Sequence, residues 1–259
     1  MTVDNELYNQ LSSTWWDENE PLNLLRTSIN PGRFGYFSQV LIKQLRIETE
    51  GKKILDVGCG GGILAEEFAR LGCQVIGIDP SASSLATARA HAQQAGLYID
   101  YRVGSGEDLP FANESFEIVY CSDVLEHVND LEKVISEIAR VLKPNGVFLY
   151  DTINRTFPSN LVMIKLLQEW KSTSFMPPNL HDWHTFIKPR ELLALLKSHR
   201  LDNREITGLK PAANPITMTI LMRKRKRGEI SLYEMGSRMT FQQSKDTSVL
   251  YMGYAIKTG

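Results

Sequence analysis

The sequence lacks long apolar runs and has few cysteines. No stretch approaches the roughly 18 unbroken apolar residues of a membrane span, and the first ten residues carry acids where a secretory signal would carry bases and an apolar run. Cys59, Cys73 and Cys121 lie at long spacings that suit neither a disulfide framework nor a zinc site. We therefore expect a cytoplasmic protein in a reducing compartment.

An excess of charge of either sign is also missing. Lys and Arg number 29 against 30 for Asp and Glu, so the net charge is −1. The chain therefore has no global field to attract nucleic acid, and we expect no nucleic-acid partner. What is present, 42% hydrophobic and 23% charged residues in a chain of 259, is typical of one globular domain.

One local run of charge departs from this balance. Residues 223–227 are all basic, and they follow the mostly apolar residues 216–222. Apolar residues followed by basic ones are the pattern of an interfacial membrane anchor, whereas a charge run alone is more often a solvated face. Peripheral membrane contact is therefore kept as an alternative.

Short apolar runs alternate with helical stretches from residue 52 onward. This alternation is typical of a mostly parallel sheet covered by helices on both faces. Right-handed crossovers give a doubly wound α/β sheet with its ligand crevice at the carboxyl ends of the strands. We expect strands at 54–57, 75–78, 101–103, 118–120, 147–150 and 249–256, a turn at 143–146, helices at 33–45 and 191–199, and helices beginning near Ile63, Ser83 and Leu131.

The regular alternation covers only the middle of the chain, and this divides a single expected domain into three parts. We expect a helical lid at 1–50, a cofactor-binding core at 51–151 and an acceptor-side half at 152–259. Two insertions, near 157–178 and 217–238, interrupt the last part. The first insertion is apolar and is placed to shape an acceptor pocket.

The strongest local signal is the glycine-rich turn DVGCGGG at residues 56–62, directly after a strand and before a helix. Glycines let the backbone turn tightly and approach a ligand with no Cβ in the way. After the next strand comes Asp79, whose carboxylate can accept hydrogen bonds from both ribose hydroxyls of an adenosine cofactor. The turn and the acid together predict an adenosyl site made by Asp56, Gly58, Gly60, Gly62 and Asp79.

The spacing within the turn indicates which cofactor binds. A dinucleotide fingerprint needs a small residue at Ile63 for close packing of helix on strand, and isoleucine is not small. S-adenosylmethionine has no pyrophosphate, and its looser pattern G-x-G-x-G is met by Gly58, Gly60 and Gly62. We therefore expect S-adenosyl-L-methionine, with an NAD oxidoreductase a poorer fit.

The loop after the third strand, GSGEDLPF at 104–111, is placed to lie beside the adenine. Ser105 or Glu107, together with backbone groups, could hydrogen-bond the edge of the base. For these two side chains the alternative is a polar loop that only precedes a turn.

Four motifs in this order resemble the class I S-adenosylmethionine-dependent methyltransferases: ILDVGCGGG, VIGIDPS, GEDLPF and VLEHV. Shorter motifs over nearly the whole chain resemble, more narrowly, the O-methyltransferases of ubiquinone biosynthesis, which act twice on polyprenylated catechols. These motifs are WWD at 15–17, PL at 21–22, Asn30-Pro31 with Arg33 and Tyr36, TINR at 152–155, HD at 181–182, FIKP at 186–189 and ITGL at 206–209. The stretch 217–238 has no counterpart in that pattern.

The resemblance implies a seven-stranded sheet and a set of cofactor contacts. Arg33 would bind the cofactor carboxylate from the lid, for which a guanidinium fork is suited. Gly58, Asp79 and the backbone around Ser122 would complete the site. For Arg33 the alternative is a solvated arginine at a helix end.

Methyl transfer to a phenolic oxygen needs a base or a cation, because the pKa of such a hydroxyl is roughly 10. Asp123, Glu126 and His127 follow the fourth strand at the mouth of the crevice. In the resembled family a Glu-x-x-Glu-His cluster at this place is associated with a divalent metal such as Mg²⁺, with Asp123 here replacing the first glutamate. A metal would lower the pKa of a bound catechol oxygen and orient it.

Histidines offer a route without metal. His127 could act as the general base with Glu126 beside it, and His181 could do so if a neighbouring group orients its ring. The alternatives are a packing role for His127, a loop histidine at position 181 and a helix cap at Asp182.

The expected function is S-adenosylmethionine-dependent transfer of a methyl group to an oxygen of a phenol, catechol or prenylated quinol precursor. Methylation of another small molecule at nitrogen or carbon is one alternative, and S-adenosylmethionine binding without catalysis is another. What separates catalysis from binding is whether Asp123, Glu126, His127 or His181 converges on the methyl group.

Overall fold

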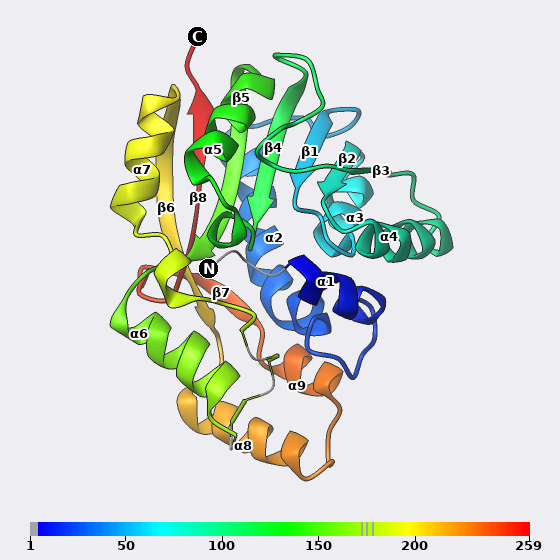
Figure 1. Ribbon diagram of the computed structural model, residues 1–259, viewed down its shortest axis with the longest axis vertical. Coiled ribbons are helices and arrows are strands. Elements are labelled where there is room, and N and C mark those ends of the chain that lie inside the picture. The colour runs from blue at the N-terminus through cyan, green and yellow to red at the C-terminus, as the bar shows by residue number, and fades with distance from the viewer. Residues whose placement is uncertain (1–4, 172, 175, 178) are drawn as a thin grey trace.

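An eight-stranded sheet forms the centre of the computed structural model, which describes residues 5–171, 173–174, 176–177 and 179–259. The strand order is β3-β2-β1-β4-β5-β8-β6-β7 (Figure 1). Strands β1 to β5 pair in parallel, and β8, β6 and β7 add antiparallel pairs at one side. The strands are β1 (Lys53–Val57), β2 (Gln74–Asp79), β3 (Asp100–Val103), β4 (Phe116–Ser122), β5 (Leu142–Ile153), β6 (Leu201–Pro211), β7 (Phe241–Ser244) and β8 (Leu250–Lys257).

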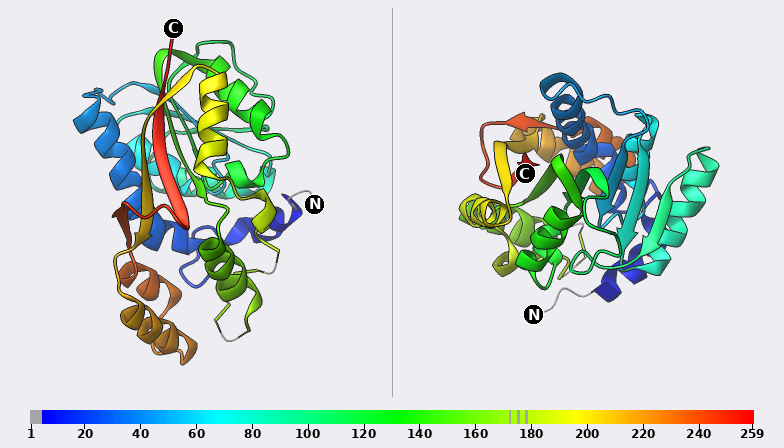
Figure 2. Two further views of the ribbon diagram at one scale, coloured as in Figure 1. Left: turned by 90° about the vertical axis from the view of Figure 1, so that its left-hand side faces the viewer. Right: turned by 90° about the horizontal axis from the view of Figure 1, so that it is seen from above.

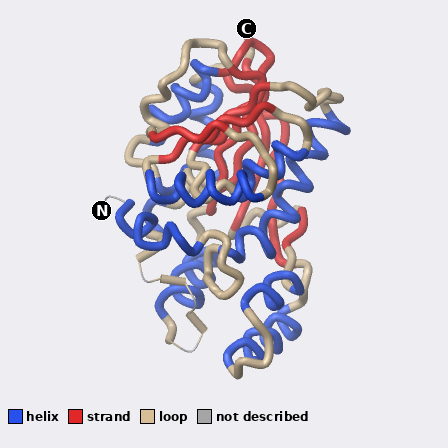
Figure 3. The backbone as a smooth tube through the Cα atoms, turned by 90° about the vertical axis from the view of Figure 1, so that its right-hand side faces the viewer, coloured by secondary structure: helices blue, strands red, loops and turns tan. Residues whose placement is uncertain are grey.

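Helices cover both faces of the sheet (Figure 3). One face carries α2 (Asn30–Ser38), α3 (Ile63–Arg70) and α4 (Ala82–Gln94), and the other carries α5 (Leu131–Val141) and α7 (Pro189–Ser198). Neighbouring strand residues point to opposite faces. Ile54 therefore packs in the first core cluster and Leu55 in the second, both fully buried.

Local capping fixes where the helices begin. The Ser81 hydroxyl accepts from the Ser84 N–H at 3.1 Å before α4, and the Asp130 carboxylate accepts from the Lys133 N–H at 3.0 Å before α5. Pro189 occupies the first turn of α7, where its missing N–H costs nothing. Because β1 to β5 are parallel, the polar residues that follow these strands lie at one edge of the sheet.

The other helical segments extend these helices or connect elements; η3 continues α2 and places Val40 and Leu41, both fully buried, in the first core cluster. In Figures 1 and 2 the helix that continues α6 lies with α8 and α9 at one end of the molecule, beyond the carboxyl ends of the parallel strands. No helix in the described ranges is both long and apolar enough to cross a membrane. These segments are α1 (Asn5–Leu11), η1 (Ser12–Thr14), η2 (Leu25–Ile29), η3 (Gln39–Gln44), η4 (Leu125–His127), α6 (Phe157–Ser159), η5 (Asn160–Glu169), η6 (Trp183–Thr185), α8 (Pro215–Lys226) and α9 (Leu232–Arg238).

The structure confirms the doubly wound α/β fold and corrects its details. The sheet has eight strands, not seven: the short, half-exposed strand β7, which follows α8 and α9 in the chain, pairs antiparallel with β6 at the edge. The expected turn at 143–146 is instead an irregular part of β5, with Asn145 at a φ of 63°. The expected helix at 33–45 begins earlier, at Asn30, and continues through η3.

Candidate functional site

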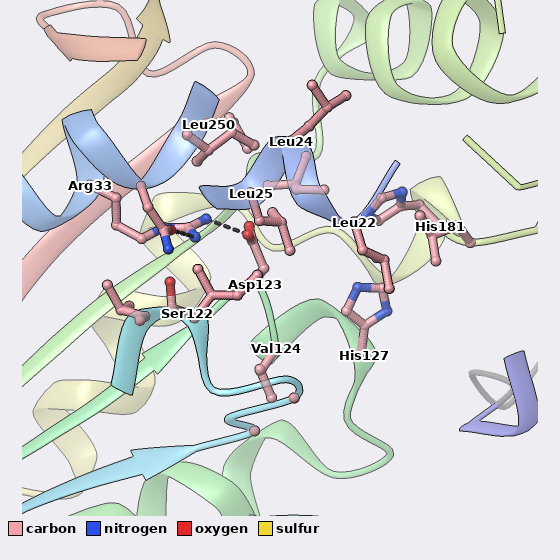
Figure 4. Close-up of a pocket in the computed structure, with 18 of the residues that line it drawn as sticks. Leu22, Leu24, Leu25, Arg33, Ser122, Asp123, Val124, His127, His181 and Leu250 are labelled. Carbon is pink, nitrogen blue, oxygen red and sulfur yellow. Dashed lines mark hydrogen bonds and ion pairs between the residues drawn. The ribbon is translucent and has the colours of Figure 1, made fainter. Parts of the chain in front are cut away.

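A cavity of about 600 Å³ opens at the carboxyl ends of the parallel strands, a size typical of small-molecule sites. Its walls come from the turns after β1, β2, β3 and β4, from the N-terminal segment, and from the insertions that contain η5, α8 and α9. Figure 4 shows Arg33, Asp123 and the two histidines on this wall, with leucines of the N-terminal segment between them. The strand ends supply the polar groups, and the insertions supply mostly apolar ones.

The glycine turn after β1 has the backbone shape that its sequence predicts. Gly58, Gly60 and Gly62 have φ angles of 78°, 50° and 79°, which residues with a side chain rarely adopt. A Cβ on Gly58 would lie 2.3 Å from Val124, and one on Gly60 would lie 2.7 Å from Trp15. Gly58 and Gly60 line the cavity, whereas Gly62 faces the Tyr101 hydroxyl and supports the turn from behind.

Asp79 connects this turn to the one after β2. Its Oδ2 accepts from the Gly60 N–H at 2.9 Å and its Oδ1 from the Ser81 N–H at 2.8 Å. Burial raises the pKa of Asp79 above its ordinary value, and these two backbone donors oppose the shift. The carboxylate lines the cavity, and each of its oxygens keeps a lone pair for a further donor such as a ribose hydroxyl.

The loop after β3 closes on itself beside the cavity. Glu107 accepts from the Ser105 hydroxyl and, at 3.1 Å, from the Asn129 N–H. Both predicted side chains border the cavity, and both also serve the structure of the loop.

Arg33 lies buried, 3% exposed, between two carboxylates at the ends of β4 and β5. Its Nη2 donates to Asp123 (Figure 4) and, at 2.8 Å, to Asp151, and its Nη1 donates to Asn30 at 2.8 Å. The Ser122 hydroxyl donates to the other oxygen of Asp151. Arg33 therefore lines the cavity as expected but is neutralised by the protein, and the solvated alternative is wrong.

Three carboxyl groups under the site are raised in pKa by burial. The pKa of Asp56 rises to about 8 although Tyr120 donates to its Oδ2 at 2.6 Å, and that of Asp151 rises to about 7 although Arg33 opposes the shift. Asp56 lines the cavity. The pKa of Glu126 rises to about 8 by burial, and Thr152 donates to its Oε2 at 2.6 Å.

These groups fit S-adenosylmethionine. The glycine turn leaves its backbone open to a ligand, and Asp79 keeps acceptor capacity at the end of β2. The Nε of Arg33 is buried and has no hydrogen-bond partner among the described residues. It could serve the amino-acid carboxylate, as the resemblance to the methyltransferases implies.

The predicted metal ligands do not gather into one donor set. Asp123 binds Arg33, the Glu126 carboxylate turns to Thr152, and the Nε2 of His127 lies 3.4 Å from the Tyr8 hydroxyl. Within the part of the chain that the structure describes, no three His, Cys, Asp or Glu side chains are grouped to hold a metal ion. Because Mg²⁺ demands near-octahedral oxygen ligation, this arrangement does not fit a bound divalent ion.

Two histidines share the cavity wall, with ring centroids 5.2 Å apart (Figure 4). Burial lowers the pKa of His127 to about 4, and burial together with His127 lowers that of His181 to about 3. Both rings are therefore neutral near pH 7, so each keeps a lone pair on one of its two ring nitrogens. Asp182 caps η6 by accepting from the His184 N–H at 2.9 Å, which confirms the cap interpretation.

Sequence reasoning missed several residues of the site. Asp151 had a usable signal, because it lies beside Ser122 on the neighbouring parallel strand. The wall formed by the insertions had none, because no periodicity shows which residues of an insertion turn inward. That wall includes Met163, Met176, Met218, Met222, Met235 and Met239, and Gln168 lies buried behind it against His181.

Comparisons with known proteins bear on the fold and the family of this chain. The family described as Methyltransferase domain matches residues 55–150. A solved structure described as a putative sarcosine dimethylglycine methyltransferase from Galdieria sulphuraria has a TM-score of 0.59 at 19% identity, covers 86% of each chain and shows the fold.

Two curated relatives carry the same name, ubiquinone biosynthesis O-methyltransferase. The protein from Xanthomonas euvesicatoria is 36% identical over 248 residues, covering 95% of this chain and 90% of its own. The protein from Hahella chejuensis is 39% identical over 203 residues, covering 78% and 82%. With more than four fifths of each relative matched, this chain belongs to the family of ubiquinone biosynthesis O-methyltransferases and is an S-adenosylmethionine-dependent methyltransferase.

Proposed function

We propose that the protein methylates a phenolic oxygen of a catechol or quinol precursor that carries an apolar, prenyl-type chain. The observation that carries the proposal is the pair of neutral histidines in a cavity whose far wall is apolar. In this proposal residues 1–50 cover the cavity, 51–151 bind the cofactor and 152–259 shape the acceptor side of one functional unit. The names of the relatives support the substrate class.

The cofactor is held at the strand ends. Asp79 accepts from the ribose hydroxyls, the backbone of Gly58 and Gly60 borders the nucleoside, and Arg33 binds the carboxylate. The loop of Ser105 and Glu107 lies against the adenine, and Ser122 and Asp56 hold the ends of β4 and β1. Bound S-adenosylmethionine supplies an electrophilic methyl group.

The acceptor needs a base, because its hydroxyl is protonated near pH 7. When the oxygen–carbon bond forms and the carbon–sulfur bond breaks, the phenolic proton must leave the oxygen. His181 takes this proton, and His127 lies beside it on the same wall, with the two ring centroids 5.2 Å apart. Because burial disfavours the charged imidazole, the proton passes on from His181 to water, and the positive charge lost at sulfur leaves with it.

Glu126 has no direct part in this transfer. Its carboxyl is 1% exposed, and its Oε1 has no hydrogen-bond partner among the described residues. Because Oε2 is engaged by Thr152 of β5, we give Glu126 the role of fixing η4, the short helix that carries His127.

The apolar wall favours an acceptor with a chain. Met218 and Met222 of α8, Met235 of α9 and Met239 beyond it face the cavity. Methionine is flexible and polarisable, so such a wall can fit an irregular hydrocarbon chain. A wall of this kind would be an unsuitable site for a small charged amine.

A transfer assay with labelled S-adenosylmethionine tests the proposal. Catechols with and without a prenyl chain should be methylated at oxygen, and amines of similar size should not. Transfer only to amines, or binding of the cofactor without any transfer, would replace this proposal by one of its two rivals. The position of the methyl group is read by mass spectrometry and NMR of the product.

The same assay decides the metal question that the motif raises. Because Asp123, Glu126 and His127 point to different partners, no step above is assigned to a metal. A chelator should therefore leave transfer unchanged. Loss of transfer on chelation and its return with Mg²⁺ would show that ligand binding rearranges the Arg33–Asp123 pair to make a metal site.

The second insertion favours contact with an anionic lipid surface. On α8 the methionines face the cavity while Ile216 and Ile220 are exposed, 74% and 49%, and the helix ends in the basic run. Exposed apolar residues beside several cations suit a negatively charged bilayer. We expect the protein to sediment with phosphatidylglycerol vesicles and not with neutral vesicles. Replacing Arg223, Lys226 and Arg227 by glutamine should reduce the sedimented fraction. Replacing Lys245 alone by glutamine should reduce it less.

A further inference from the structure

The His181 side chain is held by a single carboxamide from the first insertion. Gln168, 7% exposed on η5, makes three hydrogen bonds to His181. Its Oε1 accepts from the His181 backbone N–H at 2.7 Å, its Nε2 donates to the His181 carbonyl at 3.2 Å, and its Oε1 lies 2.9 Å from His181 Nδ1.

The two backbone contacts fix which way the amide faces. An N–H can only donate and a carbonyl can only accept, so the oxygen of Gln168 must lie toward the His181 N–H and the nitrogen toward its carbonyl. The atom next to Nδ1 is therefore an acceptor, and Nδ1 must carry a proton to bond it. In the neutral ring the lone pair is then on Nε2.

We propose that Gln168 is a positioning residue that holds His181 in the tautomer with Nδ1 protonated, which leaves Nε2 as the acceptor of the phenolic proton. This inference rests on the proposed function, because it specifies the atom that serves as the base. The wrong tautomer would present an N–H to the substrate hydroxyl and could not take its proton.

Among the described residues, none constrains the ring of His127 in a comparable way. Its Nε2 lies 3.4 Å from the Tyr8 hydroxyl, which can donate or accept, so this contact permits either tautomer. The hydrogen bonds between Gln168 and His181 also connect the proposed base to the acceptor wall. Met163 and Leu167, on the same η5 as Gln168, line the cavity, so a displaced insertion would release the base as well as open the pocket.

The tautomer can be measured without turnover. Two-bond ¹⁵N–¹H correlation spectra of the ring distinguish a proton on Nδ1 from one on Nε2. His181 of the wild-type protein should show the Nδ1 proton, and Gln168→Leu should show a mixture or the other tautomer. A wild-type ring protonated on Nε2 would overturn the inference, whatever the activity.

Kinetics then tests the role in transfer. Gln168→Leu should lower kcat by roughly tenfold or more, within the range of general-base catalysis, with S-adenosylmethionine affinity unchanged by calorimetry. Gln168→Glu keeps an acceptor for Nδ1 and should recover most of the loss. Glu169→Gln is the matched control, since it removes the exposed pair with Lys165 on the same helix and should leave kcat unchanged.

A double-mutant cycle separates positioning from mere support of the fold. In a His181→Phe background, Gln168→Leu should cost nothing further, because the group that it positions is gone. A loss of equal size in both backgrounds would assign Gln168 a structural role and overturn the inference. If neither the wild-type protein nor any variant methylates a catechol, the proposed function fails. The NMR spectra still decide whether Gln168 sets the tautomer of His181.

Discussion

The two sides of the cavity are built in different ways. The cofactor side consists of turns that directly follow β1, β2, β3 and β4, and its polar groups are held by backbone amides and by one another. The acceptor side consists of helices inserted after β5 and β6, and its surface is mostly methionine and leucine. Strand ends hold a fixed ligand at defined polar points, whereas inserted helices can be changed to suit another acceptor without disturbing the sheet.

The largest expected effect is on the cofactor side, at Arg33. Removing the cation in Arg33→Gln leaves Asp123 and Asp151 facing each other with no positive partner. Breaking a buried ion pair costs about 3 to 5 kcal/mol, so the free energy of unfolding in urea should fall by about that much. Arg26→Gln, which breaks a more exposed pair with Glu18, should cost under about 1 kcal/mol. Equal losses in the two variants would contradict the buried network.

Asp79→Asn should come next. It keeps a carbonyl oxygen for one backbone donor but loses the charge that strengthens bonds from ribose hydroxyls, each worth about 1.5 to 3 kcal/mol. S-adenosylmethionine affinity measured by calorimetry should weaken by roughly a hundredfold. Asp100→Asn, at the start of the neighbouring strand and paired with Arg102 at the surface, is the control and should bind normally. Unchanged binding in Asp79→Asn would remove the ribose role.

A smaller and more selective effect is expected on the acceptor side. Replacing Met218 and Met222 by serine should lower kcat/KM for a catechol with a prenyl chain by about tenfold, because both side chains are only half-buried and contribute a part of the about 1.5 to 3 kcal/mol of a fully buried methionine. The same variant should treat a catechol without a chain as the wild type does. The double variant Ile216→Ser with Ile220→Ser, on the exposed part of the same helix, should leave kcat/KM unchanged for both substrates. A loss shared by both substrates would show that α8 supports the fold and does not select the chain.

The effect of pH is spread over several buried groups. The folded pKa values of Asp56 and Glu126 are raised to about 8 and that of Asp151 to about 7, so above about pH 4 the native state binds more protons than the unfolded chain. His127 and His181 have lowered values and reduce stability as pH falls through about 6.5, the value of the unfolded chain. Between pH 6.5 and 8 the loss from the three carboxyl groups exceeds the small gain from the histidines, so stability should fall by about 3 kcal/mol as pH rises. A rise over this interval, measured by urea unfolding without ligand, would contradict the burial of these carboxyls.

Most of the core was predictable because its signals are local. The parallel strands and the helices beginning at Ile63, Ala82 and Leu131 follow from apolar runs, caps and glycines that lie next to each other in the chain. The strand β6 was not predicted, because its half-exposed stretch alternates little between apolar and polar residues. β7 depends on β6 for pairing, and no local pattern specifies it.

The sequence by itself determined the nucleotide-binding half. A glycine turn after one strand and an acid after the next strand come to lie side by side in any parallel sheet, because the carboxyl ends of its strands share one edge. Only the tertiary structure decided that Arg33 pairs with Asp123, that Asp123, Glu126 and His127 point apart, and that Gln168 holds His181. These contacts join residues up to 119 positions apart, and the direction of a side chain across such a distance is set by the packing of whole elements and not by neighbours in the chain.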